Sequence, residues 1–325
     1  MSSSTAAKSI LRHASRMSTG SLRASVSKTG VPSISSSRGL TTAVDPKTHI
    51  PCAEFSTPKV RELLQKSILK GLPDKEVKTR IELAAAYRLF ELKGWNENIY
   101  NHLTAKVEEE DGTESFLINP FGLRYGEITA SSLIKVGANG KIKDYGVTGD
   151  IFGINDAGFV IHSAIHRARP EVASVMHCHY PPATGLACTK YGLLELAQTT
   201  HQAGPVTYHD YQGIVTDRGE QKSLVEDLGS SNIMILRNHG VITAAESISA
   251  AWYLMYELLA ASEIQSHASA CALGSKDNLI QPEESKVKKT WSVTRDNGFS
   301  GSQFGSKEMS AYMRLLDQKD PSYRL

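Results

Sequence analysis

Ala173-Ser-Val-Met-His-Cys-His179 and Ile233-Met-Ile-Leu-Arg-Asn-His-Gly240 are two short, mainly apolar stretches, each with histidine at or near its end. Such runs are typical of buried β-strands. Side chains alternate between the faces of a strand, so His177 and His179 should project from one face while Met176 and Cys178 point to the other. His239 should stand at the end of the second strand, beside a glycine that permits a tight turn.

These three histidines suggest a metal site. Imidazole is a common zinc ligand, and three protein ligands leave at least one coordination position open, which is the pattern of catalytic rather than structural zinc. A His-x-His pair also occurs as ordinary half-buried strand residues. The spacing alone leaves both interpretations open.

Outward from these stretches, helical and strand patterns interleave, which favours α/β layering in a single domain. Gly137-Ala138-Asn139-Gly140 is interpreted as a turn and not as a phosphate-binding loop, because no glycine–lysine–hydroxyl cluster follows it. The apolar spacing predicts helices from Thr57 to about Leu69, from Pro73 to Gly94, at Phe159–Ala168, Pro181–Tyr191 and Arg218–Leu228, from about Ala244 to Ala270, and near Lys307–Leu316; it predicts strands at Tyr100–Val107, Ser115–Asn119, Leu133–Val136, Ala173–His179, near Gly213–Thr216 and at Asn232–Arg237.

Composition excludes several classes of protein. The formal net charge of the 325-residue chain is +2, which gives no general attraction to nucleic acid or to an anionic membrane. The four cysteines show no paired spacing and are interpreted as reduced thiols. No apolar run approaches the roughly 20 residues that cross a bilayer, so we expect a soluble protein with no membrane span.

Residues 1–50 differ from the rest of the chain. They are rich in serine and basic residues, and Asp45 is their only acid. This composition describes a disordered segment and resembles a mitochondrial transit peptide, with a matrix-protease site that would leave Thr41 near the new N-terminus. The alternative is a disordered basic arm on a cytosolic protein. The expected division of the chain is 1–50 as this segment, 51–275 as the α/β domain and 276–325 as a C-terminal extension.

An ordered series of motifs resembles the class II aldolase/adducin family, and most closely the adducin head domain. The resemblance covers about Glu62 to Ala272 and implies a single three-layer α/β/α domain. The motifs are Lys93-Gly94-Trp95-Asn96, Tyr100-Asn101-His102-Leu103-Thr104, Asn119-Pro120-Phe121-Gly122, Ala157-Gly158-Phe159-Val160-Ile161-His162-Ser163-Ala164-Ile165-His166, His177-Cys178-His179, Tyr208-His209-Asp210-Tyr211-Gln212-Gly213 and Leu236-Arg237-Asn238-His239-Gly240.

In the aldolases the histidines that match His177, His179 and His239 bind zinc, so the resemblance implies Zn²⁺ or another divalent metal on these residues. Other aldolase groups are missing. The acid/base glutamate is replaced by Gly158, which cannot move a proton. The phosphate-binding pairs are replaced by Asn101-His102, Phe121-Gly122 and Asp156-Ala157, where Phe121 lacks a hydroxyl donor and Asp156 would repel phosphate. The substrate-binding candidates in these positions are Asn101, His102, Gly122 and Asp156.

Proton transfer would then need other residues. Tyr208, Tyr211 and Asp156 are the catalytic candidates, and the resemblance implies that a neighbouring subunit helps complete the site. The His209-Asp210-Tyr211 stretch could equally be a hydrogen-bonded turn. His162 and His166 lie four residues apart on one helix face, and we expect them to be neighbours of the site or interface residues rather than ligands.

Two functions remain open. One is a zinc enzyme, of the lyase, epimerase or dehydratase type, acting on a small unphosphorylated hydroxy-carbonyl substrate. The other is a non-catalytic adducin-like protein that acts in self-association and binds actin filaments, although the lysine-rich adducin tail is absent from this sequence. Both imply a homo-oligomer, expected to be a tetramer. The location is expected to be mitochondrial, or cytoplasmic and cytoskeletal under the second function.

Overall fold

The structure is a computed structural model that describes residues 52–213, 218–296 and 304–325. These residues all lie in one compact unit, Asp45–Leu325. The expected transit peptide at 1–50 falls outside the described residues, and so does most of the strand expected near Gly213–Thr216. Within the described part of the chain, no helix is both long and apolar enough to cross a membrane.

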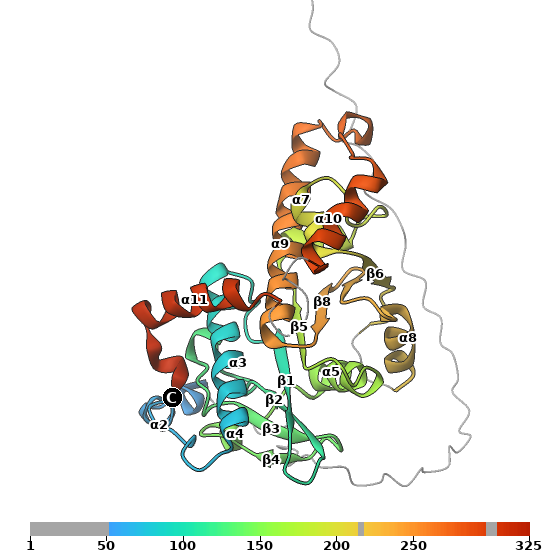
Figure 1. Cartoon of the computed structure of the whole chain (residues 1–325). Helices are drawn as coiled ribbons and strands as arrows, with labels where there is room; N and C mark the ends of the chain where they lie inside the picture. The colour runs from blue at the N-terminus through green and yellow to red at the C-terminus, as the bar shows by residue number, and fades with distance from the viewer. Residues whose placement is uncertain (1–51, 214–217, 297–303) are drawn as a thin grey trace, which may run out of the picture. The chain divides into compact units, whose positions relative to one another are not determined.

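An eight-stranded sheet forms the centre of the fold, with the order β4-β3-β2-β1-β5-β8-β7-β6 (Figure 1). Neighbouring strands are antiparallel except β6 and β7, which are parallel. The strands are β1 (His102–Glu108), β2 (Glu114–Ile118), β3 (Ile134–Gly137), β4 (Ile142–Asp144), β5 (Ser174–Cys178), β6 (Val206–His209), β7 (Ile233–Leu236) and β8 (Gly240–Ala245).

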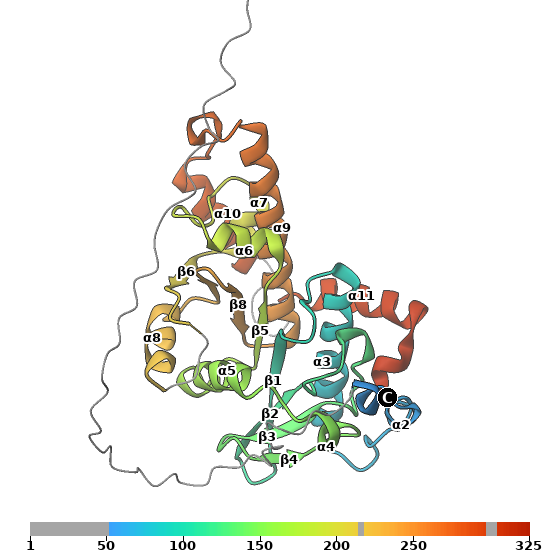
Figure 2. The same ribbon diagram turned by 180° about the vertical axis from the view of Figure 1, so that it is seen from behind.

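Helices cover both faces of the sheet, which confirms the expected three-layer α/β/α fold. One face packs against α3 (Asp74–Lys93), α6 (Pro181–Ala187) and α9 (Ile248–Cys271). The other packs against α5 (Asp156–Ala168) and α8 (Arg218–Leu228), as the views from front and back show (Figures 1 and 2). The remaining helices are α1 (Cys52–Phe55), α2 (Pro58–Leu63), α4 (Gly149–Phe152), α7 (Gln198–Ala203), α10 (Glu284–Asp296) and α11 (Ser306–Lys319), with 3₁₀ turns at Tyr125–Glu127, Lys276–Asn278 and Pro321–Arg324.

Local sequence signals set the ends of the main helices. Helix α3 follows Pro73 and ends at Gly94, whose φ of 68° is the left-handed conformation that glycine adopts without strain. Helix α5 begins after Asn155, whose side chain accepts a hydrogen bond from the backbone N–H of Gly158. Ser247 caps α9 in the same way, by accepting from the N–H of Ala250.

Several expected elements have different bounds. The helix expected from Thr57 to Leu69 ends at Leu63, and the one expected to reach Tyr191 ends at Ala187. The long helix begins at Ile248 rather than Ala244, because Ala244 and Ala245 complete β8 and pair with β5. A Gly-Val-Ile-Thr-Ala-Ala run fits a strand or a helix equally well by periodicity, so the pairing with β5 decides.

The region after Gly274 is more ordered than its polar sequence predicts. Helix α10 was not expected, and α11 packs against both α3 and α9. Phe304 and Tyr323 are fully buried in the same core cluster as α3 and α9. The C-terminus is also hydrogen-bonded to the domain, since Ala130 N–H donates to Tyr323 O (2.9 Å) and Ser131 N–H donates to Leu325 O (2.7 Å).

Candidate metal centre

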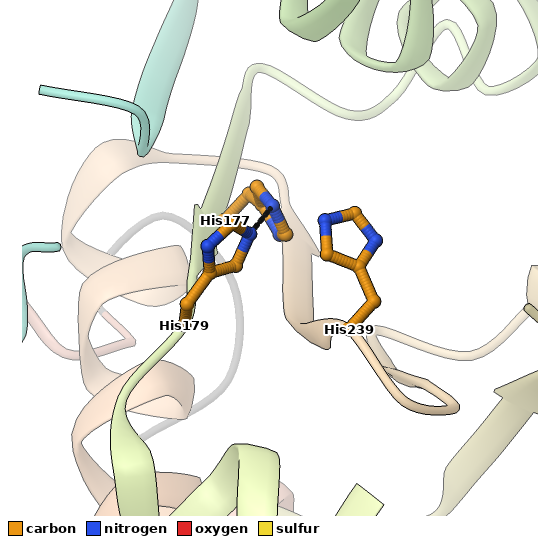
Figure 3. A group of neighbouring side chains, drawn as sticks. All are labelled: His177, His179 and His239. Carbon is orange, nitrogen blue, oxygen red and sulfur yellow. Dashed lines mark hydrogen bonds between the residues drawn. The ribbon is translucent and has the colours of Figure 1, made fainter. Parts of the chain in front are cut away.

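His177, His179 and His239 converge at one end of β5 (Figure 3). His177 lies in β5, His179 follows its last residue, and Met176 and Cys178 point to the opposite face, into the core under α9. The ring centroids are 4.6 Å apart for His177 and His179, 4.9 Å for His177 and His239, and 4.7 Å for His179 and His239. One ligand atom from each residue lies within 4.8 Å of the other two. The alternation expected for the strand therefore places these rings together.

The turn between β7 and β8 brings His239 to the other two histidines. Leu236 and Gly240 are paired across this turn, and Asn238 adopts a φ of 57° within it. A Cβ at position 240 would lie 2.5 Å from Cys178 O and 2.8 Å from His179 Cδ2. Only glycine lets β8 begin so close to the end of β5, and this approach sets the distance between His239 and the pair.

The hydrogen bonds of the histidines fit a metal site. Nδ1–H of His177 donates to the backbone carbonyl of Val241 (3.0 Å), and Nδ1–H of His179 donates to the carboxylate of Glu97 (2.5 Å). These acceptors leave the lone pair of each ring on Nε2, and the two Nε2 atoms lie 2.8 Å apart. Two lone pairs at this distance repel unless a proton or a cation lies between them. The donor set therefore suits a divalent cation held by imidazole nitrogens.

Burial keeps two of the rings neutral. It lowers the pKa of His177 well below the ordinary histidine value, and the neighbouring histidines lower it further. Burial also lowers the pKa of His239 to about 4, with a further contribution from His179. Neutral imidazole is the form that binds metal, so these two residues need lose no proton to act as ligands at neutral pH.

A second group of histidines lies beside the first, under α5. His102 in β1 pairs with His177 in the sheet register, and its ring is 4.3 Å from that of His162. Thr104 Oγ1 is 2.8 Å from His162 Nδ1 and 2.9 Å from His166 Nε2. Burial lowers the pKa of His102 and His166 to about 4 and that of His162 well below its ordinary value. These three buried, neutral rings support the centre, and none belongs to the group whose ligand atoms converge.

Gly158 packs directly against this second group. A Cβ at position 158 would lie 2.4 Å from Cε1 and 2.6 Å from Nε2 of His102. His102 is 3% exposed and occupies the space that a side chain on residue 158 would need. A glutamate at position 158 would therefore require His102 to move, so the side chain that position 158 can hold depends on His102.

The close packing of Gly158 against His102 predicts whether a substitution at position 158 stabilises or destabilises the fold. Alanine for glycine inside a helix ordinarily stabilises by up to about 1 kcal/mol. We expect Gly158→Ala to destabilise by about 1–3 kcal/mol instead, because the new methyl group overlaps the His102 ring. Urea unfolding of Gly158→Ala, His102→Ala and the double variant measures this. The double variant should lose at least about 0.5 kcal/mol less than the sum of the single losses, as expected for residues in contact; strictly additive losses would contradict the coupling.

The other candidate residues lie at different distances from the centre. Tyr211 is 55% exposed, its ring is 6.5 Å from that of His239, and together with His209, Gln212 and Arg237 it lines a small hollow next to His239. The hydroxyl of Tyr208 instead accepts from Leu193 N–H (3.0 Å), on the side of the loop after α6.

The remaining candidates come from loops and a helix start. Asp156 is exposed at the first turn of α5. Asn101 is buried behind the loop that carries Glu97. Gly122 packs against Phe152. His209 lies in β6 and donates from Nδ1 to Asp227 (2.7 Å).

The sequence analysis missed Glu97. This carboxylate is 82 residues away from its partner His179 along the chain, and no spacing rule joins the two. Glu97 does lie between two of the quoted motifs, Lys93–Asn96 and Tyr100–Thr104, and this position is the one signal that could have drawn attention to it.

Known proteins resemble the chain over most of its length. The model of the Class II Aldolase and Adducin N-terminal domain matches residues 81–266. An adducin-related protein of Schizosaccharomyces pombe is 65% identical over 316 residues, which cover 97% of each chain. Alpha-adducin of Rattus norvegicus is 44% identical over 245 residues, which cover 73% of this chain and 33% of alpha-adducin. A solved structure of an aldolase II superfamily protein from Pseudomonas syringae aligns with a TM-score of 0.74 and 38% identity, covering 80% of this chain and 100% of that one.

Proposed function

The chain belongs to the class II aldolase and adducin N-terminal domain family, and from this premise we propose that it is a zinc-dependent enzyme acting on a small unphosphorylated hydroxy-carbonyl substrate. His177, His179 and His239 would hold the metal. The reaction would be of the lyase, epimerase or dehydratase type, in which a proton moves next to a substrate oxygen.

The observation that carries this proposal is the facing pair of Nε2 atoms on His177 and His179, with His239 beside them. Both Nδ1 atoms are already satisfied by oxygen acceptors, so the rings are oriented before any ligand arrives. A divalent cation at this position supplies Lewis-acid chemistry, which polarises substrate oxygens and stabilises developing negative charge. The chain itself must supply substrate contacts and the group that moves the proton.

Tyr211 is the best placed of the proposed proton-transfer residues, because it is exposed and next to His239. Asp156 and Tyr208 also remain proposed proton-transfer residues, and these roles would depend on a neighbouring subunit or on a bound substrate. Asn101, His102, Gly122 and Asp156 stay the proposed substrate-binding positions. Since Asn101 and His102 are buried, they would act by shaping the site from behind.

A phosphorylated ketose should not be cleaved. Positioned acid/base groups contribute about 10²–10⁴-fold to such rates, and Gly158 supplies none. Phe121 and Ala157 offer no side-chain donors to a phosphate, and Asp156 adds a negative charge. In a coupled aldolase assay, the zinc-loaded protein should show no measurable turnover of fuculose or ribulose phosphate. Ready turnover would contradict the proposal.

The proposal also requires activity on an unphosphorylated substrate. A panel of small hydroxy-carbonyl compounds should include at least one that is converted with zinc and not after chelation. Tyr211→Phe should lower that rate, because it removes the hydroxyl of the tyrosine whose ring is 6.5 Å from that of His239, while the matched Tyr191→Phe, at another exposed tyrosine, should not. Zinc-loaded protein that is inactive on the whole panel would favour the second function below.

A non-catalytic adducin-like role is the second candidate, and the 65% identity to an adducin-related protein favours it. In this role the domain would serve self-association and bind actin filaments. Co-sedimentation with filamentous actin tests this role. If the protein is only an enzyme, the amount of it in the pellet should be the same with and without filaments. Because the chain spans about a third of alpha-adducin, the functions of the whole of that protein need not reside in the shared part.

Under either function we propose that the chain forms a homo-oligomer. The proposed assembly is a tetramer, with the metal centre near subunit contacts. The proposed mitochondrial destination depends on residues 1–50, which lie outside the described residues; a cytoplasmic or cytoskeletal location is the alternative.

A further inference from the structure

Glu97 is a carboxylate held against one of the three converging histidines. Its Oε2 accepts from Nδ1–H of His179 at 2.5 Å. The Glu97 side chain is 56% exposed and that of His179 19% exposed, so this hydrogen bond lies where the centre opens to solvent.

The loop that carries Glu97 is fixed from behind. The buried side chain of Asn101 accepts from Glu97 N–H through Oδ1 (2.7 Å), and Tyr100 N–H donates to Glu97 O (3.1 Å). Asn98, inside this turn, adopts a φ of 49°. These contacts hold the backbone of Glu97, so its carboxylate reaches His179 from a fixed position.

The two β5 histidines are therefore oriented by different acceptors. His177 donates to a neutral backbone carbonyl that belongs to the sheet, whereas His179 donates to a charged side chain from a loop. A charged acceptor makes a stronger hydrogen bond than a neutral one and raises the electron density on the opposite ring nitrogen. The orientation of the His179 ring then depends on one side chain that can be replaced without disturbing the sheet.

We propose that Glu97 is a positioning residue for this centre: its carboxylate keeps the proton of His179 on Nδ1, turns Nε2 toward His177 and His239, and offsets one positive charge of a bound divalent cation. This inference rests on the proposed function in one respect, namely that the three histidines bind a metal. The effect on the His179 tautomer does not depend on metal.

Zinc affinity of the full-length protein, measured by competition with a chromophoric chelator, provides the first test. Glu97→Ala should weaken zinc binding by about 10–100-fold, the usual cost of removing a carboxylate partner of a metal-binding histidine. Glu97→Gln should weaken it less, because the amide oxygen still accepts but carries no charge. Glu91→Gln is the matched control: Glu91 precedes the same loop and contacts Asn96 and Arg124, so the affinity should stay within about twofold of wild type.

The second test needs no metal. In ¹⁵N-imidazole spectra of the metal-free protein at pH 8, His179 should carry its proton on Nδ1. Glu97→Ala should shift it toward the Nε2–H form, and Glu97→Gln should keep it on Nδ1. Unchanged zinc affinity together with an unchanged tautomer in Glu97→Ala would overturn the inference. If the wild type binds no zinc, the proposed function fails, and the tautomer spectra alone decide whether Glu97 positions His179.

Discussion

Purified full-length protein prepared without chelators should contain close to one zinc-like ion per chain, and His177→Ala should lose most of it. His177 supplies the buried member of the converging set. Its removal takes away one of three imidazole ligands and leaves Nε2 of His179 without its facing partner. The loss of affinity should therefore exceed the roughly 10–100-fold that follows from removing an orienting neighbour. Elemental analysis and chelator competition measure both quantities.

The control for this experiment is His267→Ala. His267 is an exposed histidine on α9, where Nδ1–H donates to the backbone carbonyl of Glu263 (2.9 Å), and it takes no part in the centre. Its removal should leave the metal content at the wild-type level. His239→Ala should lose metal as His177→Ala does. Because His239 is less buried than His177, this variant separates loss of a ligand from a folding defect. Wild-type protein without bound metal would refute the central proposal.

Arg80→Ala should lower the free energy of unfolding by about 3–5 kcal/mol, the cost of removing one partner from a buried ion pair. Arg80 in α3 is completely buried. Its Nε donates to Glu76 (2.8 Å), one terminal nitrogen donates to Leu133 O (2.8 Å), and the other donates to Asp144 (2.7 Å). The variant would leave the buried carboxylate of Glu76 with Lys135 as its remaining ion-pair partner and would remove the donor to Leu133 O. Urea unfolding, followed by circular dichroism, measures the loss.

Lys78→Ala is the matched control, because Lys78 is exposed on the same helix. Its effect should stay within about 0.5 kcal/mol, as for most surface substitutions. If Arg80→Ala stays equally close to wild type, the network between α3, β3 and β4 does not contribute the expected free energy to stability.

Local patterns in the sequence predicted much of the architecture. Helices α3, α5 and α8 match the expected ranges closely, because each has an apolar stripe and a capping or stop signal at its ends. The two faces of β5 follow from alternation alone, so the side-by-side placement of His177 and His179 was available from Ala173–His179. The third histidine, His239, was expected at the end of a second strand, and the ordered motifs that identified the family imply the same residue.

Other features required contacts between distant segments. In α3 the apolar Leu92 is 40% exposed, whereas the charged residues Glu76 and Arg80 are buried. Hydrophobic spacing cannot predict this, because the charge of Arg80 is offset by Glu76 and Asp144, and Asp144 lies 64 residues away along the chain. The short run Gly240–Ala245 became a strand through its pairing with β5. Phe304 and Tyr323 are core residues because α11 and the C-terminal turn pack against α3 and α9.

The sequence by itself therefore determined the fold class and which three histidines are the candidate metal ligands. These depend on short-range periodicity, on turn chemistry and on motifs whose order can be compared directly. The tertiary structure alone decided that Glu97 meets His179, that Val241 O orients His177, and that His102 fills the space beside Gly158. Each of these is a contact between residues far apart in the chain, made specific by hydrogen-bond direction and close packing. No pattern within one segment encodes such a contact, because it exists only once both segments have been brought together in the folded domain.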